Sequence, residues 1–448
     1  MLAVVVSQAD RASEHIGQRL LELGDWTDYK DDSRPPADGG GTYHRIDGEQ
    51  PAELRTFTEL HIHAEGLAEP FDNPDLLFVV SRHSGETGPL LTAHPTGNSG
   101  PADFGGEPGA FARAAPNALV ALLASFNEHV PAGYDVGMEC THHGPTDLEI
   151  PSLFVELGSG DEQWDDPAGA RAVAQAVLDC RAVAPERARQ LVGFGGGHYA
   201  PRFERICRTT DWAVGHVLAD WVLEAMPHPR EATAVLERAF EQSGARHAVV
   251  EGDRPVLQDV IEELGYEVVS ETWTRETAGV PLPTVDRLET ALSPVDAGLR
   301  FGDPARGYEG DHIVRELPAE LTAEAANVDA TAARGAVASA ALAFETEEGA
   351  TRPAGRIALA AEEDFATIVE GLAGVLESTY ETVRVESEAV VAIRETFDPG
   401  TARELGVEPG PAFGQLADGE PVEGDGRQVE PAEVHEREEQ RFPVDATR

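Results

Sequence analysis

Apolar positions along the first 275 residues follow two alternating periods, which predict strands separated by helices. Leu2–Ser7 is a continuous apolar run that predicts a buried strand, and in Arg11–Leu23 apolar side chains recur at helical spacing. Pro116 begins another helical pattern, and strands and helices alternate as far as Tyr266–Val269. Strands separated by helices are typical of a parallel or mixed sheet covered on both faces. We therefore predict an α/β fold, a three-layer α/β/α sandwich with a mixed sheet.

The pattern changes after residue 275. Residues 276–300 contain Pro281, Pro283 and Pro294, which predict a linker. Residues 301–448 are rich in Ala and Glu and predict an acidic C-terminal extension of α+β structure, to which the sequence assigns no role. Thirteen of the 15 histidines precede residue 276. We therefore expect the chemistry in a catalytic domain at residues 1–275.

The chain is strongly acidic along its whole length. Its 34 basic and 81 acidic residues give a formal net charge of −47, and Lys30 is the only lysine. An acidic, lysine-poor surface keeps a protein hydrated in molar salt, where the Debye length is about 3 Å. The composition thus indicates an extreme halophile. Because adaptation to salt accounts for the acidity, the negative charge does not by itself exclude a nucleic-acid partner. Binding by counterion release would be poor in such salt, although a local arginine cluster could still touch phosphate.

Other features of the sequence bear on its location. No run of 18 apolar residues is present, so we expect no membrane span. The apolar start is followed at once by Gln8-Ala-Asp10, which favours a buried strand over a signal peptide. The three cysteines, Cys140, Cys180 and Cys207, are widely spaced. They predict a reducing cytoplasm and no disulfide framework.

Histidines gather in four short motifs bounded by Gly and Pro, each after a predicted strand. His83 follows one strand, His94 ends another before Pro95, and His142-His143 stands before Gly144-Pro145. His198 follows the glycines at 195–197. Loops at the carboxyl ends of strands carry the active sites of α/β sheets. We therefore expect these imidazoles, the common metal ligands and proton carriers of proteins, in one cleft.

Two carboxylates accompany the histidines. Glu139 lies three residues before His142, and with the histidine pair it could hold Zn²⁺. Glu156, at the end of a predicted strand, could be a ligand or a general base. The amides of Gly196 and Gly197 could approach an oxyanion. In each case a structural role, as a turn cap or a packed side chain, is the alternative.

Other constellations carry less weight. Ser84 and Ser159 lack the Gly-x-Ser-x-Gly context of a nucleophilic serine. His61 and His63 are spaced i, i+2, which is more typical of the polar face of a strand, so we leave them out of the site.

These motifs carry a resemblance to a known family. Five segments (residues 81–84, 91–98, 139–146, 154–159 and 193–202), in this order and spacing, resemble the archaeal and plant family of D-aminoacyl-tRNA deacylases. The resemblance spans about residues 1–272. It implies a zinc-dependent enzyme that hydrolyses the ester between a D-amino acid and tRNA, with a fold similar to peptidyl-tRNA hydrolase and purine nucleoside phosphorylase. It also implies tRNA as the partner, and we expect no DNA partner and a monomer.

The residues suit this chemistry. Zinc held by three of the six candidate ligands would activate water for attack on the ester. Which of them bind metal stays open, as does whether His198 and Glu156 act instead as catalytic groups. The candidate ligands are His83, His94, Glu139, His142, His143 and His198. We expect contacts to substrate from Asn98, Tyr199 and Arg202.

Two other classes of function remain open. One is a zinc hydrolase or nucleoside-type enzyme that acts on a free small molecule, because a fold does not fix a function. The other is a non-catalytic tRNA-binding protein whose histidines are structural.

Overall fold

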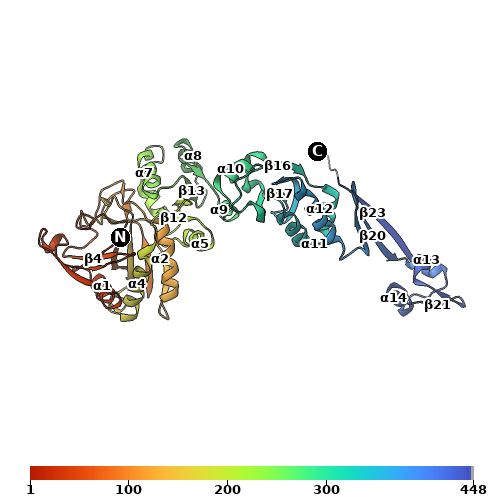
Figure 1. The fold of residues 1–448 in the computed structure, drawn as a ribbon, viewed down its shortest axis with the longest axis horizontal. Helices are drawn as coiled ribbons and strands as arrows, with labels where there is room; N and C mark the ends of the chain where they lie inside the picture. Colours follow the sequence, from red (N-terminus) through yellow and green to blue (C-terminus); the bar gives the residue numbers. More distant parts are fainter. Residues whose placement is uncertain (445–448) are drawn as a thin grey trace. The chain divides into compact units, whose positions relative to one another are not determined.

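In the computed structural model, which describes residues 1–444, the chain forms two units, Met1–Arg275 and Glu276–Arg448 (Figure 1). The first unit is built on an eight-stranded sheet with the order β2-β3-β4-β1-β5-β10-β6-β9. Its strands are β1 (Leu2–Ser7), β2 (Thr27–Asp31), β3 (Gly41–Ile46), β4 (Ala52–Phe57), β5 (Leu76–Arg82), β6 (Leu90–His94), β9 (Asp135–Met138) and β10 (Ser152–Gly158).

Strand direction changes within this sheet. β4, β1, β5 and β10 are mutually parallel, whereas β6 runs antiparallel to β10 and β9 runs parallel to β6. β2 and β3 form an antiparallel hairpin at the other edge. The mixed sheet predicted from the sequence is therefore confirmed.

Helices α1 (Arg11–Leu23), α2 (Pro116–His129) and α4 (Pro167–Asp179) cover one face of the sheet. Asp10 caps α1, since its carboxylate accepts the Ser13 backbone N–H at 3.1 Å. Two glycines allow close packing: a Cβ on Gly17 of α1 would lie 3.0 Å from the Val6 side chain, and one on Gly169 of α4 only 2.7 Å from Leu157. A larger residue at either position would push its helix away from the sheet.

Loops cover the other face. Side chains from the strands, including Val5, Val79 and Phe154, pack there with Leu67 and Leu148, which belong to loops. The apolar side chains of these loops take the place of a helical layer. The three-layer sandwich predicted from the sequence is therefore not confirmed.

A second, parallel sheet with the order β12-β11-β13-β14 completes the first unit. The Thr141 N–H, beyond β9, donates to the Val217 carbonyl of β12 at 2.9 Å, and this bond links the two sheets. The remaining elements are β11 (Gln190–Phe194), β12 (Ala213–Leu218), β13 (His247–Val250), β14 (Glu267–Val268), α5 (Pro201–Thr209), α6 (Asp220–Ala225), α7 (Thr233–Ser243), α8 (Pro255–Glu263), α9 (Glu271–Glu276), α3 (Asp161–Trp164), β7 (Gly97–Asn98) and β8 (Ala110–Phe111).

The second unit combines antiparallel strands with helices, and α11 and α12 pack together over its largest apolar cluster. Its helices are α10 (Leu282–Ala291), α11 (Ala319–Ala338), α12 (Glu363–Leu376), α13 (Pro399–Glu404) and α14 (Pro411–Ala417). Its strands are β15 (Arg300–Phe301), β16 (Ile313–Glu316), β17 (Ala343–Glu347), β18 (Arg352–Leu359), β19 (Thr382–Val385), β20 (Ala389–Phe397), β21 (Val422–Gly424), β22 (Arg427–Val429) and β23 (His435–Pro443).

Residues 276–300, predicted as a linker, are partly helical. They include α10, whose Val285 and Leu288 are buried. Pro281 precedes this helix and Pro283 lies in its first turn, where a missing N–H breaks no helical hydrogen bond. The prolines therefore mark the start of a helix.

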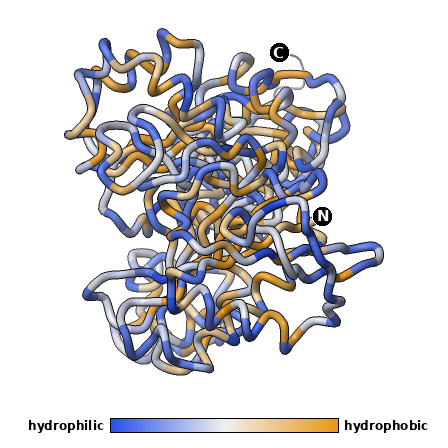
Figure 2. The backbone as a smooth tube through the Cα atoms, turned by 90° about the vertical axis from the view of Figure 1, so that its left-hand side faces the viewer, coloured by the Kyte–Doolittle hydropathy of each residue, from blue (hydrophilic) through white to orange (hydrophobic). Residues whose placement is uncertain are grey.

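The hydropathy of the chain follows this architecture. Hydrophilic and hydrophobic stretches alternate along the backbone trace (Figure 2). Within residues 1–444, no helix is long and apolar enough to cross a membrane.

Candidate active site

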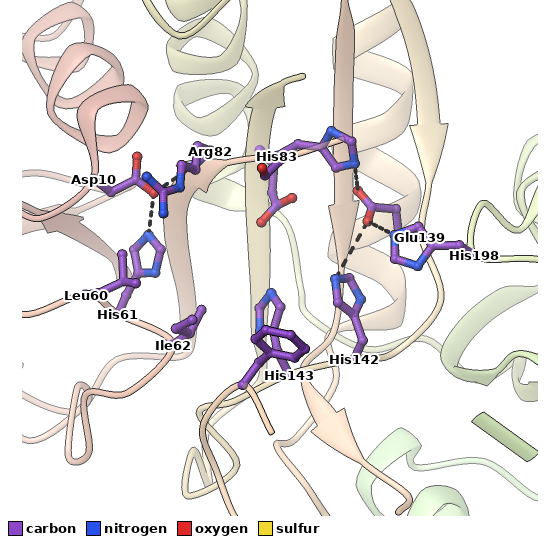
Figure 3. Close-up of a pocket in the computed structure, with 13 residues that line it drawn as sticks. Asp10, Leu60, His61, Ile62, Arg82, His83, Glu139, His142, His143 and His198 are labelled. Carbon is purple, nitrogen blue, oxygen red and sulfur yellow. Dashed lines mark hydrogen bonds and ion pairs between the residues drawn. The ribbon is translucent and has the colours of Figure 1, made fainter. Parts of the chain in front are cut away.

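Histidine motifs from distant parts of the sequence line one cavity of about 380 Å³ in the first unit (Figure 3). Most of the residues that line it have ionisable side chains. The lining residues are Asp10, Leu60, His61, Ile62, Arg82, His83, Ser84, Phe104, Glu139, His142, His143, Glu156 and His198.

The site lies on the loop-covered face of the large sheet rather than at one edge. β6 and β9 run against β5 and β10, so the carboxyl ends of these strands do not meet at a common edge. Instead, His94 lies opposite Phe154, and Thr92 lies opposite Glu156. Because alternate residues of a strand share a face, His94 and Glu156 project from the same side of the sheet. Their Nε2 and Oε1 atoms are 3.6 Å apart.

Glu139 is the centre of the cluster, and it is completely buried. Its Oε2 accepts a hydrogen bond from His198 Nε2 at 2.7 Å and lies 3.8 Å from His142 Nε2. Its Oε1 lies 3.8 Å from His83 Nε2. Burial opposes ionisation of this carboxyl, but the bond from His198 and the surrounding imidazoles hold its pKa well below the ordinary range. Glu139 is therefore an anion inside the protein.

Four imidazoles contact one another at the site: His142, His143 and His198 line the cavity, and His94 is completely buried. The His142 ring stacks on that of His94, with centroids 4.1 Å apart, and lies edge-on to His198 at 4.8 Å. His143 meets the His94 ring edge-on at 4.9 Å. His143 has a φ of 45°, a left-handed conformation that is uncommon in residues other than glycine.

Protonation divides these imidazoles into two kinds. Burial lowers the pKa of His142 and of His143 well below the ordinary value. Hydrogen bonds to Cys140 and to Glu139 raise the pKa of His198 to about 10. His142 and His143 are thus neutral at neutral pH, the form in which imidazole binds metals, whereas His198 carries a proton.

Two other partners fix the side chains around the cluster. The Ser81 hydroxyl donates to Glu156 Oε1 at 2.7 Å. His83 is held from both sides, because its Nδ1 is hydrogen-bonded to Ser159 Oγ and its Nε2 to the Tyr199 hydroxyl, each at 3.0 Å. These contacts hold the acid–base groups in defined orientations.

The residues present fit a metal ion. Two donor atoms, His94 Nε2 and Glu139 Oε1, are buried and have no hydrogen-bond partner in residues 1–444. Such orphaned atoms are costly, by about 1–3 kcal/mol each, and a bound cation would satisfy both. Imidazole and carboxylate donors suit Zn²⁺. Sets of three residues with donor atoms within 4.8 Å of one another are His94, His142 and His143; Cys140, His142 and His198; His83, Glu139 and His198; and His94, Glu139 and Glu156.

Some residues expected in the site have other partners. The Gly196 N–H donates to Asp220 Oδ1 at 3.1 Å, so this amide is not free for an oxyanion. Neither Gly196 nor Gly197 lines the cavity. Gly195 and Gly196 have φ values of 96° and 80°, which serve the turn after β11. Arg202 lies on α5 and pairs with Glu271 at 3.2 Å, outside the cavity.

Other expected residues do lie at the site. Tyr199 reaches His83, as described above, and Asn98 lines a second cavity that adjoins the first. Asn98 Nδ2 donates to the Gly105 carbonyl at 2.8 Å.

Two residues at the site were not predicted from the sequence. His61, which we left out, is buried in the cavity wall, with Nε2 3.1 Å from Asp10 Oδ2 (Figure 3). β4 ends at Phe57, so His61 lies in a turn and not on the polar face of a strand. Cys140 contributes a sulfur 3.7 Å from His198 Nδ1. Its position between Glu139 and His142 was the one available hint.

A hydrolytic enzyme with an α/β fold is the class that this fold and this buried histidine–carboxylate site define. A family model described as D-aminoacyl-tRNA deacylase matches residues 70–269, which contain all five motifs. The chain belongs to the D-aminoacyl-tRNA deacylase family, as its similarity to whole proteins of that name shows.

Two of these relatives come from halophilic archaea, in agreement with the acidic composition. The D-aminoacyl-tRNA deacylase of Natronomonas pharaonis is 55% identical over 442 residues, which cover 99% of this chain and 100% of the relative. That of Halorubrum lacusprofundi is 50% identical, over 100% of this chain and 97% of the relative. A crystal structure of a conserved protein of unknown function has a TM-score of 0.55 and 27% identity, over 62% of this chain and 98% of that one.

Proposed function

We propose that this protein hydrolyses the ester bond of D-aminoacyl-tRNA and releases the free D-amino acid and tRNA, which keeps D-residues out of protein synthesis. The observation that carries the proposal is the convergence of Glu139, His83, His142 and His198 on one cavity, in a chain similar over its whole length to proteins of that name. Residues 1–275, which contain the cavity, are the catalytic domain of this proposal. Its setting is the cytoplasm, where aminoacyl-tRNA is used.

The metal of this proposal is zinc, with ligands drawn from five residues. The clustered donor atoms and the two orphaned buried atoms support it. When bound, zinc polarises an ester carbonyl and makes water a stronger acid. The proposed ligands are His83, His94, Glu139, His142 and His143.

The acid–base work falls to two residues that border the cavity. Hydrolysis adds water to the carbonyl carbon, breaks the bond from that carbon to the ribose oxygen, and leaves this oxygen with a proton. Glu156 is placed to take the water proton, since the Ser81 hydroxyl orients its carboxylate by a hydrogen bond to Oε1, the same oxygen that lies 3.6 Å from His94 Nε2. His198 holds a proton at Nε2 against Glu139 and is the more exposed imidazole of the cluster, at 36% of its side chain. It is therefore placed to supply the proton to the leaving oxygen.

The proposed pocket has to distinguish D- from L-amino acids, because cleavage of L-aminoacyl-tRNA would remove the substrates of translation. A misplacement of the ester carbonyl by about 1 Å can lower a rate roughly 100-fold. Discrimination therefore needs only that an L side chain shifts the carbonyl away from the cluster.

The test compares D-Tyr-tRNA with L-Tyr-tRNA in molar KCl. Release of D-tyrosine alone would support the proposal, and equal rates on both substrates would overturn it. Binding of tRNA without release would favour a binding protein, and activity only on free amides would favour a small-molecule hydrolase. His129→Ala is the matched control, because His129 pairs with Asp179 on the surface, away from the cavity.

A further inference from the structure

A second cavity of about 510 Å³ adjoins the one described above. The two have different chemistry on either side of a common wall. Carboxylates of Asp10, Glu139 and Glu156 border the first cavity, whereas Trp221, Val222 and Ala225 border the second. The residues of the common wall are Phe104, His142, His143 and His198.

The second cavity carries two aromatic side chains that are unusually exposed. Phe104 is 68% exposed and Trp221 is 49% exposed. The Trp221 ring lies near the cluster, with its centroid 6.5 Å from that of His198 and the planes inclined by 32°. Exposed aromatic groups beside an active site are typical of a surface that a ligand covers.

A polar group in the same wall also lacks a partner. Ser99 is 5% exposed, and its Oγ has no hydrogen-bond partner in the part of the chain that the structure describes. Buried hydroxyls are nearly always hydrogen-bonded, so an orphaned one in a cavity wall points to a ligand that completes it. A hydroxyl both donates and accepts, as recognition of a nucleoside requires.

The position of the ester decides which part of a substrate reaches which cavity. The ester carbonyl has to lie at the imidazole wall, so the two halves of the substrate extend to opposite sides of it. The α-ammonium group of the amino acid is attracted to the carboxylates of the first cavity. The nucleoside half then extends into the second cavity, where it meets Trp221 and Phe104.

High salt favours recognition of the nucleoside by stacking over recognition of tRNA phosphates by charge. A chain with a net charge of −47 repels the phosphates of tRNA, and in molar salt counterion release contributes little. Stacking of unpaired bases on aromatic side chains needs no charge and recognises the single-stranded ends of RNA. We propose that the second cavity binds the terminal adenosine of tRNA, with its base stacked on Trp221 and Phe104. This inference rests on the function proposed above.

The first experiment measures kcat and KM on D-Tyr-tRNA and on D-Ala-tRNA. Trp221→Ala and Phe104→Ala should each raise KM roughly 5- to 100-fold with little change in kcat, since base stacking is lost in the enzyme–substrate complex. Trp221→Phe, which keeps an aromatic face, should restore most of the affinity. Tyr29→Ala removes an exposed aromatic side chain from β2 and should change neither kcat nor KM. An unchanged KM in both alanine variants would overturn the proposal.

The two substrates separate the possible occupants of the cavity. A bound adenosine requires equal effects on D-Tyr-tRNA and D-Ala-tRNA. An effect confined to D-Tyr-tRNA would overturn the proposal and assign the cavity to the amino-acid side chain.

The second experiment does not depend on catalysis. Adenosine is titrated into the protein in molar KCl while tryptophan fluorescence is recorded. Quenching in the wild type that is absent in Trp221→Phe supports the proposal, because the other four tryptophans are common to both proteins. Quenching without D-specific hydrolysis would refute only the proposed function. D-specific hydrolysis without quenching, and with KM unchanged in the alanine variants, would refute only this inference.

Discussion

His198 Nε2 lies 2.7 Å from Glu139 Oε2, although the two residues follow strands of different sheets. Glu139 follows β9 of the large sheet, and His198 follows β11 of the second sheet. The Cys140 N–H donates to the His198 carbonyl at 2.8 Å and fixes the approach of the two segments. The cluster is therefore assembled only when both sheets are folded and docked.

Replacement of Glu139 tests the centre of the cluster. Glu139→Gln keeps the shape of the side chain but removes the negative charge toward which His198, His142 and His83 point. We expect kcat/KM on D-Tyr-tRNA to fall at least about 100-fold and bound metal to be lost. Kinetics and metal content of the same preparation check this. A folded variant with full metal content and near-wild-type kcat/KM would show that Glu139 is not a ligand.

Replacement of the adjacent histidines tests the imidazole row. At least one of His142→Ala and His143→Ala should lower turnover by roughly two orders of magnitude, the size expected for a lost ligand or base. His129→Ala is the surface control. If both variants stay folded and keep near-wild-type rates, the assignment of this pair to the site is wrong.

Metal removal gives a third prediction. Treatment with a chelator should abolish deacylation and added Zn²⁺ should restore it, because the buried donor atoms of His94 and Glu139 need a cation. Activity and bound zinc should return in proportion. Full activity of metal-free protein would leave hydrolysis to His198 and Glu156 as plain acid–base groups.

His216 predicts a dependence of stability on pH. It is completely buried, and its ring contacts the Thr141 hydroxyl and the Ala112 carbonyl. Burial, opposed only by the bond to Ala112, lowers its pKa to about 4, below the ordinary value of 6.5. Between about pH 4 and pH 6.5, His216 is therefore protonated in the unfolded chain and neutral in the folded chain. Through His216, the free energy of unfolding is at its maximum above about pH 6.5 and falls by about 3 kcal/mol as the pH drops to 4.

Chemical unfolding in molar KCl at pH 7 and pH 5 measures this effect. The wild type should lose roughly 2 kcal/mol between these two pH values through His216. His216→Gln should show a correspondingly smaller loss. Equal losses in the two proteins would mean that His216 titrates alike in the folded and unfolded chains.

Salt should govern the fold itself. With a net charge of −47, self-repulsion is screened only at high ionic strength. We expect progressive unfolding on dialysis from molar KCl to dilute buffer, followed by circular dichroism. A protein that keeps its secondary structure in dilute buffer would contradict the halophilic interpretation.

The sequence predicts the composition of the site better than its placement. The motifs around His83, His142 and His198 do converge, since turn residues and strand ends leave local signals. The direction of β6 leaves none, because an apolar run looks the same in either orientation. As a result, the candidate site lies on a face of the sheet, whereas the sequence predicts it in loops at the carboxyl ends of the strands.

Two further differences also have local causes. A turn with Gly196 looks the same whether its amide faces a ligand or, as here, Asp220. His61 meets Asp10 across 51 residues of sequence, a contact that no spacing rule covers.

The division between sheet and loops has a consequence for how such an enzyme diversifies. His94 and Glu156 project from paired strands, whereas Ser99 and Phe104 belong to the connection between β7 and β8. Exchange of residues in a connection disturbs few backbone hydrogen bonds, while a shift in a buried strand displaces every neighbour. Natural variation in residues 99–109 can therefore change substrate affinity while the residues proposed for catalysis stay the same. Exchange of this segment between relatives is a starting point for engineering.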